Sequence, residues 1–308
     1  MTHVTHAKLL GVCIDETRSF VQHAQLSGNR ATKCFGKVSR ISASSWGVRY
    51  RALRILYVGT YVATVTYAAA VWWRRTTSYS VRSALLRTQR PALVLLTKAY
   101  RSVSTAALPV LAATLPADLE VLRAGRIAQE CSELATSEER NSRKDCITRE
   151  VIDQWQDRWS SSADGRELFA FFPRISGRMS YVWVEPEYVV SQILTGHGCF
   201  RSRLHNMRLS ETAECFCGHE RETRDHILWE CKLYDEEREI MLADWWRAES
   251  GPVYHGDLVA SAEGYRRLRA FAHGWHRKRR DIESCTMSAR TRGNINVTSS
   301  PRRGRVGK

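Results

Sequence analysis

Apolar residues recur at helical spacing through the first third of the chain. The stretches 20–26, 31–41, 50–73 and 81–100 each place apolar side chains three or four positions apart. Pro91 lies inside the last stretch, where we expect it to bend or interrupt the helix. The run 7–15, which Gly11 divides, is instead typical of a strand that leads into a turn. The pattern therefore predicts a helical bundle that follows a short strand.

Helical periodicity continues after residue 116. One helix is expected at 117–134, with Asp118 or Thr114 as its N-cap, and a charged amphipathic helix at 136–159. Ser, Gly and Pro then break the pattern over 160–185, where residues 181–184 could form an edge strand. We place a domain boundary there, near residue 163.

The second half contains three further predicted helices. They lie at 186–195, which Gly196 should end, at 235–246 and at 262–280. From about residue 286 the chain is rich in Ser, Thr, Arg and Gly, a composition that predicts a disordered basic tail. The predicted fold class is mainly α.

Residues 55–73 form the longest uncharged stretch, 19 positions in length. That length would permit a membrane span. However, Arg residues flank both ends, and three Thr and three Tyr lower the hydrophobicity. We therefore expect a buried central helix and no membrane partner.

The net charge of +15 is distributed unevenly. Residues 1–114 hold 16 Lys and Arg against only two acids, Asp15 and Glu16, whereas residues 115–274 have a balance of −7 and residues 275–308 of +8. A region with so few carboxylates requires an anionic partner. Nucleic acid is the commonest such partner, and an anionic membrane surface or an acidic domain is the alternative.

The predicted phosphate contacts lie in the basic first third and in the segment WHRKRR. Each residue taken alone is more often a solvated helix face, so the prediction concerns the set. Trp275, in the same segment, could stack on a base or pack inward. The set is Lys33, Lys37, Arg40, Arg49, Arg51, Arg54, Arg74, Arg75, Arg277, Lys278, Arg279 and Arg280.

The segment CFCGHERETRDHILWEC brings candidate metal ligands together. Cys215, Cys217, His226 and Cys231 form a four-ligand set, with His219 as a possible substitute ligand. Zn²⁺ prefers tetrahedral sulfur and nitrogen donors, and four protein ligands leave no open position for substrate. The sequence therefore predicts a structural zinc site whose binding energy folds the loop.

No self-sufficient active site is recognisable in the sequence. There is no GxxxxGKS/T loop, GxSxG, HExxH or glycine-rich dinucleotide turn. A nucleotidyl-transfer centre needs neighbouring carboxylates that hold Mg²⁺ ions, and the adjacent Asp15 and Glu16 would point to opposite faces of a strand. No catalytic residue is predicted. The absence of a signal peptide and an odd count of nine Cys favour a reducing compartment.

Several segments, taken in order, resemble a known family. KLLGVCID, LYVGTYVATVTYAAAVW, TGHGCFRSRLH and the Cys/His segment are similar to the C-terminal portion of insect non-LTR retrotransposon polyproteins. The resemblance is greatest to the type-1 elements that insert into ribosomal DNA, and it covers the chain up to about residue 250. A PD…D endonuclease constellation is not found after the Cys/His segment, as expected for type-1 elements.

The resemblance implies four parts of the chain. Residues 1–15 would end the reverse-transcriptase palm, and 16–162 would form a basic helical thumb and linker. Residues 163–285 would form a C-terminal domain with flanking helices and a zinc knuckle at 215–231, and 286–308 the disordered tail. In the family the catalytic aspartate pair, which binds Mg²⁺, lies upstream of the LGV segment.

Two functions are consistent with the sequence. The first is a partial reverse transcriptase that grips element RNA, target DNA or their RNA–DNA duplex in the nucleus, without polymerase or endonuclease activity of its own. The second is a stand-alone zinc-dependent RNA- or DNA-binding protein. In the second, Phe216 or Trp229 would stack on unpaired bases, although both side chains could instead pack beneath the metal. The sequence predicts no oligomeric state.

Overall fold

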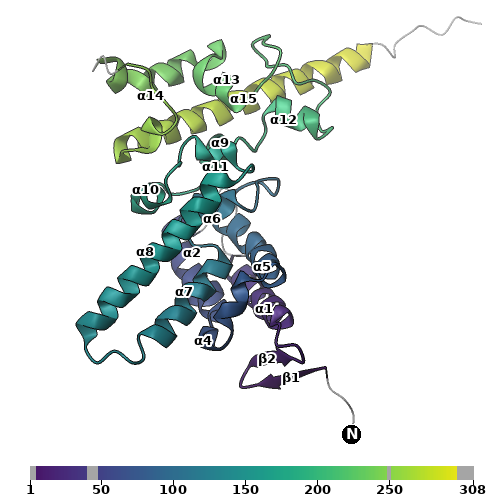
Figure 1. The fold of residues 1–308 in the computed structure, drawn as a ribbon. Coiled ribbons are helices and arrows are strands. Elements are labelled where there is room, and N and C mark those ends of the chain that lie inside the picture. The colour runs from purple at the N-terminus through teal and green to yellow at the C-terminus, as the bar shows by residue number, and fades with distance from the viewer. Residues whose placement is uncertain (1–4, 40–47, 248–250, 297–308) are drawn as a thin grey trace, which may run out of the picture.

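The computed structural model describes residues 5–39, 48–247 and 251–296, and the fold in this part of the chain is mainly helical. Figure 1 shows helices α1 to α8 gathered in one half of the molecule, below α9 to α11. Helices α12 to α15 lie across the other end, and the β-hairpin lies at the opposite extremity. The predicted fold class is confirmed at this level.

The N-terminal apolar run forms two strands instead of the single predicted strand. Strands β1 (His6–Leu9) and β2 (Val12–Asp15) pair antiparallel, with His6 opposite Asp15. Leu10 and Gly11 connect them with φ angles of 46° and 87°, the left-handed geometry that a two-residue hairpin turn requires. Gly11 therefore reverses the chain where we had expected it only to interrupt a strand.

Two long helices form the centre of the bundle. Helix α1 (Val21–Ser39) joins the two helices predicted at 20–26 and 31–41, and it packs along α5 (Tyr79–Thr97). The absence of a side chain at Gly28 allows this approach, because a Cβ there would lie 2.1 Å from the Thr88 hydroxyl. Helix α5 continues through Pro91, which lies on the exposed side of the helix.

The uncharged stretch is a series of short helical segments and not one helix. After α2 (Tyr50–Tyr57) follow a π-helical segment (Val58–Val62), α3 (Ala63–Val65), α4 (Ala69–Trp72) and a 3₁₀ segment (Trp73–Thr77). Ala68 has a φ of 50°, and the two halves are bent by 48°. Among the described residues no single helix has the length and apolarity to cross a membrane, although this bent pair meets both measures.

Neither predicted cap residue caps the next long helix. Helices α6 (Ala107–Leu111) and α7 (Ala117–Glu130) are joined through Pro116, the N-cap residue of α7, which makes no side-chain cap hydrogen bond. Asp118 instead forms an ion pair with Arg158 at 2.5 Å, and burial raises the pKa of its carboxyl group.

Helix α8 (Ser137–Ser161) begins with a capping box. The Thr136 hydroxyl accepts a hydrogen bond from the backbone of Glu139, and the Glu139 carboxylate accepts one from the backbone of Thr136. Buried side chains before and after residue 163 belong to one contiguous core. The domain boundary near that residue stays a prediction.

The remaining elements surround the Cys/His segment. Gly196, with a φ of 65°, ends α11 as predicted. No strand forms at 181–184, where Tyr181 and Trp183 stack in a turn. The elements are α9 (Arg166–Phe169), α10 (Ile175–Ser180), α11 (Tyr188–Thr195), α12 (Arg201–Asn206), α13 (Arg224–Trp229), the 3₁₀ segment Lys232–Tyr234, α14 (Asp235–Arg247), the 3₁₀ segment Asp257–Val259 and α15 (Ala262–Asn296).

Helix α15 is longer than the sequence predicts. It was expected to end near residue 280, with a disordered tail from residue 286, but the helix continues to Asn296. Its polar second half has few apolar residues, which is why the composition suggested disorder. The rest of the predicted tail, 297–308, lies outside the described residues.

Candidate metal centre and basic surfaces

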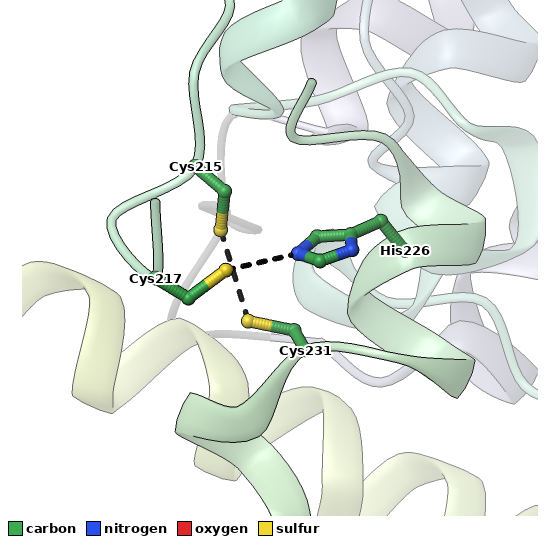
Figure 2. A group of neighbouring side chains, drawn as sticks. All are labelled: Cys215, Cys217, His226 and Cys231. Carbon is green, nitrogen blue, oxygen red and sulfur yellow. Dashed lines mark hydrogen bonds between the residues drawn. The ribbon is translucent and has the colours of Figure 1, made fainter. Parts of the chain in front are cut away.

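The four predicted zinc ligands lie together. Their ligand atoms are all within 4.8 Å of one another, and Figure 2 shows the side chains converging from two loops and α13. The Sγ atoms of Cys215 and Cys231 are 3.7 Å apart, and Cys217 Sγ is 3.3 Å from His226 Nε2. A tetrahedral ion with Zn–S bonds of about 2.3 Å separates its sulfur ligands by about 3.7 Å. The arrangement therefore fits a tetrahedral zinc ion.

Local backbone structure positions the ligands. Gly218, with a φ of 90°, turns the chain after the two thiols and donates a backbone hydrogen bond to the carbonyl of Cys215. The Thr223 hydroxyl caps α13 by accepting from the backbone N–H of His226, which fixes His226 in the first helical turn. Cys231 follows the helix, and its backbone N–H donates to the carbonyl of His226.

The imidazole of His226 is oriented for metal binding. Its Nδ1 atom faces the Glu230 carboxylate at 3.3 Å, which leaves Nε2 directed at the cluster. Burial lowers the pKa of His226, so the neutral form that binds metal is favoured. His219 stacks on His226 with the ring centroids 4.1 Å apart. It belongs to a second possible ligand group with His226 and Glu230, not to the four-residue cluster.

The environment of the Cys215 thiol favours its protonated form. Hydrogen bonding to Cys231 and burial together raise the pKa of the Cys215 thiol far above its usual range. A zinc ion would displace this proton, because thiolate is the form that binds metal. Zinc affinity at this site should therefore fall as the pH is lowered.

A cationic stripe runs along α1. Lys33 and Lys37 are exposed, and Arg30, which is not among the predicted phosphate contacts, lies on the same face because the three residues are spaced i, i+3 and i+7. Helix α1 contains no acidic residue. The spacing alone could have identified Arg30. Arg40 lies outside the described residues.

The other predicted phosphate contacts of the first third form two separate groups. Arg51 pairs with Glu185, and Arg54 donates to the carbonyl of Ala113 before the start of α7. Arg74 lies near Gln129, at the far end of α7. A helix of 14 residues is about 21 Å long, so α7 separates these groups by roughly that distance. Arg49, with the first group, and Arg75, with the second, are exposed.

The basic segment of α15 is only partly exposed. Arg277 and Arg280 are exposed, and Lys278 pairs with Glu236 and Glu237. Arg279 is 2% exposed and pairs with the buried Glu222. It cannot reach a phosphate from this position, so its inclusion among the phosphate contacts is wrong.

The aromatic residues near the Cys/His cluster are in different environments. Trp275 is fully buried and stacks on Phe200, so it packs inward. Phe216 is half-buried, and the guanidinium of Arg201 lies 4.6 Å from its ring centroid. Trp229 is also half-buried and faces His255.

Comparison with known proteins identifies the family. The chain is 30% identical over 291 residues to a "Retrovirus-related Pol polyprotein from type-1 retrotransposable element R1 4" of Nasonia vitripennis, covering 90% of this chain and 73% of the relative. A second Nasonia polyprotein, from element R1 3, is 31% identical over 84% of this chain and 72% of its own length. The R1 polyprotein of Bradysia coprophila is 32% identical over 78% of this chain but only 25% of its own length.

These relatives are all retrotransposon Pol polyproteins, which confirms the family that the sequence resembles. The chain belongs to the R1 type-1 retrotransposable element family of Pol polyproteins. No protein-family model matches the chain. No solved structure matches it either.

Proposed function

We propose that this chain is the part of an R1 Pol polyprotein that grips nucleic acid during target-primed reverse transcription. In this proposal the bundle of α1 to α8 is the thumb and linker of the polymerase, and it holds an RNA–DNA duplex through its phosphates. The Mg²⁺-binding aspartates and the endonuclease belong to other parts of the polyprotein. Because the target is chromosomal DNA, the site of action is the nucleus.

The single observation that supports this grip most strongly is the cationic stripe of α1. Arg30, Lys33 and Lys37 are exposed on a helix with no acidic residue, within a region of 114 residues that contains only two acids. Solvated helix faces normally mix both signs of charge. An excess of one sign is typical of surfaces that contact phosphate backbones without reading sequence.

The zinc site is the second part of the proposal. Cys215, Cys217, His226 and Cys231 would hold one structural zinc ion and so order residues 211–235. The ordered loop holds Phe216 beside Arg201 of α12, and these two side chains are candidate contacts for an unpaired base. The zinc ion itself supplies no open coordination position for catalysis.

Salt-dependent binding to an RNA–DNA duplex tests the grip. Replacing Arg30, Lys33 and Lys37 with Gln should reduce the slope of log K against log salt by up to about 2.7, since each phosphate contact contributes about 0.9. The matched control replaces Lys144, Arg149 and Arg174, exposed cations outside the basic first third, with Gln. Equal slopes for the two triple variants would contradict the assignment of α1 as a phosphate contact.

Metal analysis of purified protein tests the zinc site. We expect about one zinc ion per chain and its loss in Cys231→Ser, because Cys231 is a buried member of the four-ligand cluster and a hydroxyl group is a poor replacement for a thiolate ligand. His219→Ala is the matched control and should retain zinc. Retention of zinc by Cys231→Ser would rule out this ligand set.

A further inference from the structure

A cavity of about 620 Å³ lies between the thumb and the segment that leads to the Cys/His cluster. Its walls come from four parts of the chain: Ser102 and Ser104 after α5, residues 163–167 around the start of α9, His197 after α11 with Arg203 of α12, and Arg224 at the start of α13. None of the predicted site residues that the structure describes lines it. Ser102, Ser104, Arg166, His197 and Arg203 contribute polar side chains to its lining.

A chain of hydrogen bonds directs one hydroxyl group into this cavity. The guanidinium of Arg203 contacts His197 Nε2, and because a guanidinium can only donate, Nε2 must accept. The ring proton then lies on Nδ1, which donates to Ser102 Oγ at 3.0 Å. Burial and the nearby Arg203 lower the pKa of His197 to about 4, in agreement with a neutral ring. Within the described part of the chain, the hydroxyl hydrogen of Ser102 then has no acceptor.

Two further donors line the same cavity. Ser104 Oγ accepts a hydrogen bond from the backbone of Ala107 at 3.2 Å, and among the described residues its own hydroxyl has no acceptor. Arg166 is held over the ring of Phe169, with 3.6 Å from its Cζ to the centroid, and bonds the carbonyl of Ser162 at 3.3 Å. These contacts hold the guanidinium in place and leave other N–H groups available.

The carboxylates of the cavity do not satisfy these donors. Asp164 and Glu167 also line it, but in the described structure neither carboxylate is hydrogen-bonded to Ser102, Ser104 or Arg166. With Arg166, Arg203 and Arg224 against Asp164 and Glu167, the cavity has a surplus of donors and a charge balance of only +1. A ligand that only accepts hydrogen bonds and carries a single negative charge matches both properties. A phosphodiester group has these properties.

We propose that this cavity binds one backbone phosphate of the nucleic acid through Ser102, Ser104, Arg166 and Arg203. His197 is a positioning residue, which fixes Arg203 and turns the Ser102 hydroxyl toward the phosphate. The proposal rests on the proposed function, because it assumes that the chain binds nucleic acid. It adds a contact between the α1 stripe and the Cys/His cluster, in a region that is otherwise acidic.

Two measurements on the full chain test this proposal. The first is the salt dependence of binding to an RNA–DNA duplex for Ser102→Ala and Arg203→Gln, with Arg149→Gln as the control. Arg149 is exposed on α8, about 18 Å along the helix from Ser161, and its replacement removes the same charge as Arg203→Gln. The second is the NMR signal of the His197 ring during titration with inorganic phosphate. Ser102 is exposed, so Ser102→Ala should fold normally.

We expect Arg203→Gln to reduce the salt slope by about 0.9 and Arg149→Gln to leave it unchanged. Ser102→Ala should weaken binding several-fold without changing the slope, since it removes a neutral donor. Inorganic phosphate should shift the His197 signal of the wild type but not that of Ser102→Ala. Duplex binding with identical slopes and affinities in all variants would overturn the proposal, even if phosphate shifts His197. Failure of the wild type to bind any duplex would instead overturn the proposed function.

Discussion

Replacement of Arg279 by Met should destabilise the protein far more than replacement of its neighbour Arg280. The two residues are adjacent in the basic segment of α15, but Arg279 is 2% exposed whereas Arg280 is exposed. Arg279 pairs with Glu222, which is 1% exposed, and with Glu283 at 2.8 Å. Removing one partner of a buried pair leaves the other charge without compensation and costs about 3–5 kcal/mol. The exposed Arg280 should change the free energy of unfolding by no more than about 0.5 kcal/mol.

The free energies of unfolding can be measured by urea denaturation of wild type, Arg279→Met and Arg280→Met. A double variant that also carries Glu222→Gln should recover part of the loss, because it removes the uncompensated carboxylate. Burial already raises the pKa of Glu222, so its protonation is favoured in the folded state. The difference in the free energy of unfolding between wild type and Arg279→Met should therefore become smaller as the pH falls toward that raised pKa.

Equal losses for Arg279→Met and Arg280→Met would refute this reasoning. Such a result would mean that the register of α15 differs from the one described, and Arg279 would again be a candidate phosphate contact. If the Arg279→Met/Glu222→Gln variant loses as much free energy of unfolding as its two single variants together, Glu222 and Arg279 do not interact.

Three further predictions concern the packing, the acid stability and the metal. Gly28→Ala should destabilise by about 1–3 kcal/mol because its Cβ would overlap Thr88, whereas Gly36→Ala, with no atom within 4 Å, should stabilise the same helix by about 0.5–1 kcal/mol; thermal unfolding distinguishes them. Burial raises the pKa of Glu187, but hydrogen bonds from His273 and Arg269 outweigh it and lower the pKa to about 2. This carboxylate should therefore stabilise the fold above pH 4.5 and lose that effect as the pH falls toward 2. In Glu187→Gln the midpoint of urea unfolding should depend less on pH over this range. Chelation of zinc should increase amide hydrogen exchange at 211–235 and leave α1 and α5 protected; an unchanged 211–235 segment would contradict the zinc site.

Much of the helical fold could be predicted from the spacing of apolar residues. The spacing indicated the helices now seen as α7, α8 and α11, and Gly196 marked the end of α11. It could not show that α1 is one helix, because the apolar stripe is interrupted at Gly28, where α5 approaches. Nor could it show that 50–73 is bent, since an uncharged stretch carries no signal of the turn at Ala68.

The candidate metal centre was predictable because all four ligands lie within 17 residues, so local chain reversal is enough to bring them together. The cavity of Ser102, His197 and Arg203 was not predictable, because its walls come from segments about 100 residues apart. The burial of Arg279 was not predictable for the same reason. A run of basic residues identifies a charged helix but not which face of it packs against Glu222.

The sequence by itself determined the helical class, the excess of positive charge in the first third and the composition of the Cys/His cluster. These properties depend on residue type and on short spacings along the chain, which the sequence contains directly. The tertiary structure decided which basic residues are exposed, which are buried in ion pairs, and how far apart the exposed groups lie. Those properties depend on contacts between distant segments, and the free energy of burying a charge changes with the partner that each contact supplies.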